Sequence, residues 1–195
     1  VFLIATTFRT RDDYISDPGG LPRSFTWDNL TAAWTQADLG RALVNTLIVC
    51  LVACGVCAVT ALTGAYWFRL ASGRVSGGLR WLLVSAYAIP MIAWLIPVFV
   101  ILANGGLTGN LVIAGIVNGV SSLPFALYIV HTFYGQVLTP ELLEAATLDG
   151  AGIFRTFRSI AVPLALPALA SVVALVFVWT FGDLLVAATL LQEDP

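Results

Sequence analysis

Residues 42–68 read ALVNTLIVCLVACGVCAVTALTGAYWF and contain no Asp, Glu, Lys or Arg. Residues 81–140 also lack all four of these residue types. A helix needs about 20 consecutive apolar residues to cross the hydrocarbon core of a bilayer. Only 10% of the 195 residues are charged, against about 25% in a typical soluble domain, so a soluble fold could not bury these runs. The sequence therefore predicts an all-α, polytopic membrane helix bundle.

The apolar runs divide the chain into spans and loops. Residues 1–8 are too short to span and are interpreted as the tail of a transmembrane helix that begins upstream. Residues 9–40 form a polar loop, in which a short interfacial helix is expected from Thr26, as its cap, to Trp34. Residues 191–195 are expected to begin an outer loop. Four full spans are predicted, over residues 42–67, 81–103, 109–131 and 161–190.

Proline residues interrupt two of these spans, at Pro90, Pro97 and Pro124. A break inside the bilayer is tolerated only where protein or water supplies partners for the freed backbone groups. The interrupted helices are therefore expected to be buried in the bundle or to line a cavity.

Small residues mark the predicted packing faces. Cys50, Cys54 and Cys57 follow an i, i+4, i+7 spacing within one apolar segment, which places them on one helix face. Gly115 and Gly119 form a GxxxG pair in another span. Small residues let membrane helices approach closely, so both groups are interpreted as packing surfaces rather than as thiol or metal sites.

The composition excludes several chemistries. The chain contains no Lys, so it cannot form a phosphate-binding loop of the GxxxxGK[ST] type or a Schiff base. His131 is the only histidine, which excludes an HExxH zinc site. The net charge is −2 without a basic block, and we expect no nucleic-acid binding. The chain is predicted to be no enzyme and to hold neither metal nor cofactor.

Arginine placement predicts the orientation. Residues 69–80 carry three Arg, residues 132–159 carry Arg155 and Arg158, and the hairpin at 104–108 carries none. Because positive residues mark the cytoplasmic side, the first two segments are predicted to be cytoplasmic and the long loop at 9–40 to be outside.

The loop at residues 132–160 is too polar to span and too apolar for a simple linker. Thr139 is a predicted N-cap with Pro140 at the first helical position. Gly150 is expected to end this helix in a left-handed conformation, and a second short amphipathic helix is expected over residues 153–160. The pattern is compatible with two roles for these short helices: they dock on a partner protein, or they lie on the lipid surface.

In this loop and just after it, Glu144-Ala145-Ala146 is followed after three residues by Gly150, after nine more by Ile160, and then by Val162-Pro163. This spacing resembles the EAA loop of ABC importer permeases, whose consensus is EAA-x3-G-x9-I-x-L-P. The last consensus leucine is replaced here by Val162. Asn45-Thr46-Leu47 and the stretch from Trp179 to Asp183 are similar to the carbohydrate-uptake, maltose-permease-like branch. The matching positions at the consensus spacing are Glu144, Ala145, Ala146, Gly150, Ile160 and Pro163. We call residues 132–160 the EAA loop.

The resemblance implies a fold, partners and a location. It implies a type I ABC importer permease domain over residues 41–190, of which the start of the first span and the sixth span lie outside this sequence. It implies a bacterial plasma membrane location, a second permease subunit in a heterodimer, a cytoplasmic ABC ATPase dimer, and an extracytoplasmic solute-binding protein. The residues implied for ATPase coupling are Glu144, Ala145, Ala146, Asp149, Gly150, Ile153, Phe154, Ile160 and Pro163.

A carboxylate within an apolar span is costly and suggests a pathway or a hydrogen-bonded pair. Asp183 is such a residue, and with Asn118 and Pro124 it is a candidate for the translocation pathway of a sugar or oligosaccharide.

A self-contained secondary transporter or channel is the alternative function. It would need ionisable residues near the midplane, for which Asp183 is the one candidate. An intramembrane protease would need two carboxylates or a Ser–His pair, and neither is apparent from the sequence.

The orientation predicts which loops an impermeant thiol reagent reaches in intact cells. In a background in which Cys50, Cys54 and Cys57 are replaced, Gly19→Cys should react and Thr147→Cys should not, because only the long loop at 9–40 faces outward. Labelling of position 147 without labelling of position 19 would show that the topology is inverted.

Overall fold

The computed structural model describes residues 2–36, 38–71 and 73–191, and every regular element in these ranges is helical. The chain forms two compact units, Val1–Thr46 and Leu47–Pro195. We describe each unit by itself.

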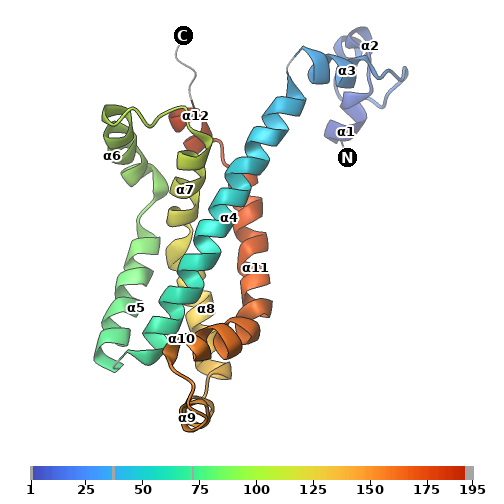
Figure 1. Ribbon diagram of the computed structural model, residues 1–195. Coiled ribbons are helices and arrows are strands. Elements are labelled where there is room, and N and C mark those ends of the chain that lie inside the picture. The colour runs from blue at the N-terminus through green and yellow to red at the C-terminus, as the bar shows by residue number, and fades with distance from the viewer. Residues whose placement is uncertain (1, 37, 72, 192–195) are drawn as a thin grey trace. The chain divides into compact units, whose positions relative to one another are not determined.

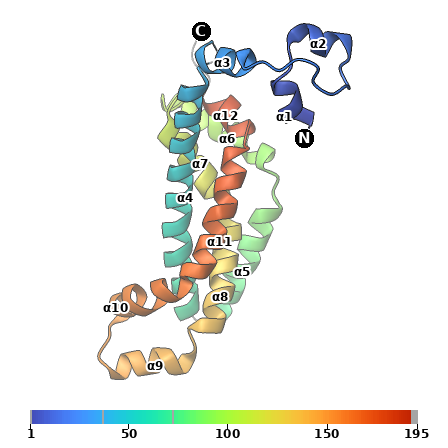
Figure 2. The same cartoon turned by 90° about the vertical axis from the view of Figure 1, so that its right-hand side faces the viewer.

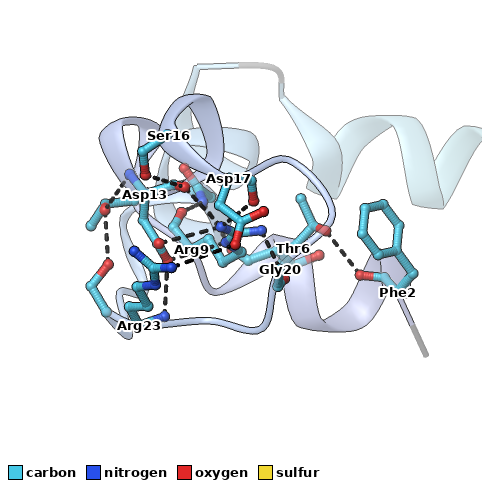
Figure 3. A network of polar contacts seen from close by, with 12 residues as sticks. Phe2, Thr6, Arg9, Asp13, Ser16, Asp17, Gly20 and Arg23 are labelled. Carbon is cyan, nitrogen blue, oxygen red and sulfur yellow. Dashed lines mark hydrogen bonds and ion pairs between the residues drawn. The ribbon is translucent and has the colours of Figure 1, made fainter.

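The N-terminal unit is organised around a buried arginine. It contains α1 (Phe2–Thr7), α2 (Arg11–Ser16), α3 (Asp28–Thr35) and the start of α4 (Leu39–Leu70). Arg9 is 2% exposed, and its guanidinium pairs with Asp13 at 3.1 Å. It also donates to the carbonyl oxygens of Asp13, Asp17 and Gly20 (Figure 3). One side chain thus ties the helix α2 to the loop that follows it.

Asp13 is held in its charged form within this network. Hydrogen bonds from the Arg9 guanidinium and then from the Arg23 backbone amide lower the pKa of Asp13 below its ordinary value of 3.8. A lowered pKa contributes stability that is present above the ordinary value and is lost as pH falls through the folded value. The loop is therefore held by charge at neutral pH.

The interfacial helix of this unit begins one residue later than expected. The predicted cap, Thr26, lies before α3, and its hydroxyl accepts from the Asp28 amide at 3.1 Å. The N-cap position is Trp27, which makes no side-chain cap. The Thr26 amide donates to the Phe8 carbonyl at 2.8 Å, which holds Thr26 in the preceding loop.

The second unit is a helix bundle in which two helices are long and apolar enough to cross a membrane (Figure 1). They are Leu39–Leu70 and the continuous stretch Ile153–Phe181, and two bent helix pairs raise the possible number of spans to four. The elements that follow α4 are α5 (Gly73–Ala88), α6 (Met91–Asn104), α7 (Leu111–Ser121), α8 (Leu123–Val137), α9 (Pro140–Leu148), α10 (Ile153–Thr156), the π-helical segment η1 (Phe157–Ala161), α11 (Val162–Phe181) and α12 (Leu185–Leu190). The stretch Ile153–Phe181 consists of α10, η1 and α11.

Two predicted spans are bent pairs of helices. The axes of Trp81–Ala88 and Met91–Asn104 meet at 87°, and those of α7 and α8 meet at 50°. Pro90 lies at the first break and Pro124 in the first turn after the second, as a missing N–H predicts. Pro97 does not interrupt its span, because it lies inside α6.

The predicted last span, 161–190, ends early. α11 stops at Phe181, and α12 is a separate helix. The Asp183 carboxylate accepts from the amides of Leu185 at 3.0 Å and Val186 at 3.3 Å. This side chain satisfies amides at the start of a new helix, which explains why the chain breaks there.

Helices extend beyond the predicted spans at the end of the bundle that carries the EAA loop. α4 continues to Leu70, α5 begins at Gly73 and α8 continues to Val137, so the hydrophilic turn expected over residues 69–80 is mostly helical. The second amphipathic helix expected over 153–160 is also not separate, because α10, η1 and α11 follow without a break. Pro163 offers no N–H to the carbonyl of Ser159, and a π-helical turn lies directly before it.

The cysteine face of α4 packs against α11, as the spacing predicts. Cys50 and Cys57 are fully buried. The Cys50 thiol donates to the Phe177 carbonyl at 3.9 Å, and the Cys54 thiol to the Val173 carbonyl at 3.6 Å. These small side chains let the two helices lie close together.

The GxxxG pair brings α7 against α4, also as predicted. A Cβ on Gly119 would lie 2.8 Å from the Ala53 carbonyl oxygen, and one on Gly115 would lie 2.9 Å from the Val49 carbonyl oxygen. Both distances are shorter than a real Cβ contact. Only glycine allows this approach of two backbones.

Adding one methyl group at this contact should therefore destabilise the bundle. Gly119→Ala must push the α4 backbone away, at a cost of about 1–3 kcal/mol for overpacking. Gly55→Ala is the matched control, because nothing lies within 4 Å of its Cβ position and alanine favours a helix by about 0.5–1 kcal/mol. Thermal unfolding in detergent should show a lower midpoint for Gly119→Ala only. Equal midpoints for the two variants would contradict the close contact.

Candidate functional site

Residues of the EAA loop itself cap the helix α9 at its N-terminus and end it at its C-terminus. The Thr139 hydroxyl accepts from the Leu142 amide at 3.4 Å, as predicted for an N-cap. Hydrogen bonds from its own backbone N–H and from the Thr139 hydroxyl lower the pKa of Glu141. At the other end, Gly150 has φ +74°, and its amide donates to the Thr147 carbonyl at 3.0 Å. The expected left-handed glycine stop is confirmed.

The predicted coupling residues are mostly exposed. Figure 2 shows α9 projecting beyond the ends of the long helices. Of the residues of α9, only Ala146 is buried, while Glu144, Ala145 and Asp149 are exposed. Ile160 instead packs against the bundle core, and Pro163 lies on the surface of α11.

Three large apolar side chains flank the turn at Gly150. Leu148 is 89% exposed, Ile153 71% and Phe154 75%. Exposed apolar side chains beside a capped helix that carries exposed carboxylates indicate an interaction surface. The sequence pattern assigns Ile153 and Phe154 to this surface, and the structure adds Leu148.

The pathway candidates gather where the helices break. A pocket of about 440 Å³ is bordered by the break before α6, the bend between α7 and α8, and the break before α12. We call it the break pocket. Irregular backbone at membrane depth is tolerated where it lines a cavity. Its lining residues are Ala86, Tyr87, Ile89, Pro90, Met91, Trp94, Asn118, Ser121, Ser122, Trp179, Thr180 and Asp183.

Two of the three pathway candidates share this pocket and the third lies beside it. Asn118 and Asp183 both line the break pocket. Pro124 lines a second pocket of about 420 Å³, which shares Trp94 and Ser121 with the first. The structure therefore groups residues that are up to 65 positions apart in the sequence.

The break pocket combines aromatic walls with a few polar groups. The Phe125 ring lies 5.0 Å from that of Trp179 and 6.2 Å from that of Tyr87. Asn118 is 6% exposed, and its amide donates to the Ala114 carbonyl at 3.3 Å. Ligand sites typically pair apolar walls with a few placed polar groups. No cluster of metal-ligating side chains occurs among the residues that the structure describes.

Sequence reasoning missed the aromatic walls. Tyr87, Trp94 and Trp179 lie in apolar segments, where an aromatic residue is as common at a lipid interface as in a site. The nearby prolines were the only signal, because they predicted breaks and a cavity without saying which side chains face it.

Comparison with known proteins agrees with this architecture. The family described as "Binding-protein-dependent transport system inner membrane component" matches residues 58–194. The putative ABC transporter permease protein ORF1 of Streptomyces antibioticus is 34% identical over 89% of this chain and 75% of its own length. The melibiose/raffinose/stachyose import permease protein MelC of Bacillus subtilis is 26% identical, over 98% and 69%.

A further relative extends the comparison. The diacetylchitobiose uptake system permease protein NgcG of Streptomyces coelicolor is 26% identical over 97% of this chain, which spans 63% of that relative. The family match covers more than two thirds of the chain, and the helices are those of a multi-pass membrane protein. The chain therefore belongs to the family of inner membrane components of binding-protein-dependent transport systems.

Proposed function

We propose that this chain is a permease subunit of an ATP-driven importer for a sugar or oligosaccharide, and that its EAA loop docks on a cytoplasmic ATPase. The observation that carries the proposal is the exposed apolar surface of Leu148, Ile153 and Phe154 around a capped helix. Because the chain contains no Lys, a phosphate-binding loop of the usual type must belong to another subunit.

The charges of α9 favour a protein partner over the lipid surface, while the two arginines of the EAA loop, Arg155 and Arg158, follow in α10 and η1. α9 and its C-cap carry Glu141, Glu144 and Asp149, all exposed, and no basic residue. Anionic headgroups attract basic segments and repel acidic ones. An exposed carboxylate at Glu144 suits a basic residue of the ATPase, and the exposed apolar side chains suit an apolar groove beside it.

The partners follow from the same proposal. Residues 41–190 would form the transmembrane domain, and a second permease subunit of different sequence would complete the pathway. An extracytoplasmic solute-binding protein would deliver the substrate to the outer loops, including residues 9–40. ATP binding and loaded binding protein can shift the permease between states only through contacts that differ between them.

The break pocket supports the substrate class. Aromatic rings offer flat apolar faces, and Asn118, Thr180 and Asp183 offer hydrogen-bonding groups, a combination that suits a ring of carbons bearing hydroxyls. The names of MelC and NgcG both refer to oligosaccharides. A secondary transporter is less well supported, because it would need ionisable residues near the midplane and Asp183 is the one candidate in the sequence.

The docking proposal predicts that Glu144→Lys and Gly150→Val abolish transport while the chain still inserts. Reversing the charge would oppose a basic residue of the ATPase, at a cost of several kcal/mol if the contact is desolvated. At Gly150, φ +74° strains a β-branched residue by about 1–3 kcal/mol. Co-purification of the ATPase and its response to loaded binding protein are the measurements.

Asp12→Lys is the control for these variants, because it changes the net charge as Glu144→Lys does but lies in the exposed part of the loop at 9–40. It should retain the ATPase. Normal co-purification and transport in both Glu144→Lys and Gly150→Val would refute the assignment of the EAA loop.

The pocket proposal predicts that Asp183→Ala impairs transport more than Asp183→Asn, with assembly intact in both. Asparagine can still accept from the amides of Leu185 and Val186, whereas alanine removes the acceptor of both amides. Substrate uptake into vesicles measures the difference. Wild-type uptake in both variants would remove Asp183 from the pathway.

A further inference from the structure

The helix α9 is joined to the bundle at two points. On one side the chain leaves α8 at Leu138, which is fully buried, and Thr139 then caps α9. On the other side the chain returns at Ile153, the first residue of α10. The carbonyl groups of Leu138 and Ile153 both accept hydrogen bonds from the last turns of α4.

Arg69 holds the first junction. Its Nε and Nη2 donate to the Leu138 carbonyl oxygen at 3.0 and 2.7 Å. The carbonyls at the end of a helix have no partner within that helix, and a cation there is favoured by the helix dipole. Among the described residues the ion pairs are Arg9–Asp13 and Arg23–Asp17, so the charge of Arg69 is directed at the end of α8 and not at a carboxylate.

Tyr66 holds the second junction. It is 6% exposed, and its hydroxyl donates to the Ile153 carbonyl at 3.2 Å. Its ring packs 5.1 Å from that of Phe157 in η1 and 6.4 Å from that of Tyr134 in α8. Tyr66 and Arg69 are three residues apart in one helix and therefore share a face.

We infer that Tyr66 and Arg69 are positioning residues that tie both ends of α9 to α4, so that a displacement of the EAA loop is transmitted to α4 as well as to α8 and α11. Ala146 of α9 is buried and Leu142 packs against the core cluster, while both ends of the segment that carries α9 are held by the two junctions. The inference rests on the proposed docking of the ATPase on this loop. Arg69 also adds positive charge on the predicted cytoplasmic side, and Arg69→Lys separates these two roles.

The test uses the assembled importer in proteoliposomes with its ATPase and its solute-binding protein. The variant Tyr66→Phe/Arg69→Gln removes the hydrogen bond of Tyr66 and replaces the charged, two-armed donation of Arg69 by a shorter neutral amide. It leaves the exposed surface of α9 intact. Arg41→Gln/Tyr128→Phe is the matched control, because Arg41 is exposed near the other end of α4 and Tyr128 is an exposed residue of α8. The readouts are bound ATPase, and ATP hydrolysis with and without loaded binding protein.

A distance measurement adds a readout that a general loss of stability would not move. Spin labels at Val59 of α4 and Thr147 of α9, both exposed, report the placement of the loop in a background without native cysteines. The Tyr66→Phe/Arg69→Gln variant should keep its ATPase and its basal hydrolysis. Stimulation by loaded binding protein should fall roughly fivefold or more, the lower end of typical coupling between sites, and the distance distribution should broaden.

Wild-type stimulation together with an unchanged distance distribution would overturn the inference. If the double variant does not accumulate in the membrane, the single variants Tyr66→Phe and Arg69→Lys are used instead. Tyr66→Phe removes one hydroxyl and keeps the aromatic ring, and Arg69→Lys changes the hydrogen bonds to Leu138 and keeps the positive charge. Lysine cannot place two N–H groups of a planar fork on one oxygen, so wild-type stimulation in both single variants would also overturn it.

The docking proposal can fail separately. If Glu144→Lys keeps the ATPase bound and coupled, the EAA loop is not the docking site and the inference fails with it. If Glu144→Lys releases the ATPase while Tyr66→Phe/Arg69→Gln behaves as wild type, only the role of the two ties is refuted.

Discussion

The need to satisfy every backbone hydrogen bond inside a bilayer underlies this structure. An amide or carbonyl without a partner costs several kcal/mol in hydrocarbon, so an uninterrupted helix is the default and each interruption needs a local remedy. The chain breaks before α6, between α7 and α8, and before α12. All three breaks border one pocket, and at the last of them the Asp183 carboxylate supplies the partner for two amides. The breaks are therefore arranged around one location instead of being scattered along the spans.

The local features of the fold could be predicted because they depend on local sequence. The helix class follows from uncharged runs longer than a bilayer, and the cap at Thr139 and the stop at Gly150 follow from residue types that suit those backbone positions. Gly115 and Gly119 predicted close packing without identifying the partner helix. The structure supplies that partner, α4, through the carbonyl oxygens of Val49 and Ala53.

Other features depend on contacts between distant segments and were outside the reach of pattern reasoning. Composition does not show where Arg69 points, and the sequence suggests only a charge near the membrane surface. Its contact with Leu138, 69 residues away, is created by the packing of α4 beside α8. The separation of α12 from α11 lies beyond the sequence pattern for a related reason. A carboxylate in an apolar span suggests a pathway or a hydrogen-bonded pair, and only the structure shows that Asp183 accepts from the first two amides of α12.

The contact of α7 with α4 has a mechanical consequence. The carbonyl oxygens of α4 lie so close to Gly115 and Gly119 that α4 and α7 cannot shift along or rotate against each other without moving apart. The two helices therefore behave as one rigid unit. Asn118 and Ser121 of α7 line the break pocket from this rigid unit. Pro90, Met91 and Trp94 line the same pocket from α6 and the residue before it. A molecule in the pocket would therefore contact one rigid side, formed by α4 and α7, and one side formed by helices that meet at breaks. Changes in the volume of the pocket would come from hinge motion at those breaks.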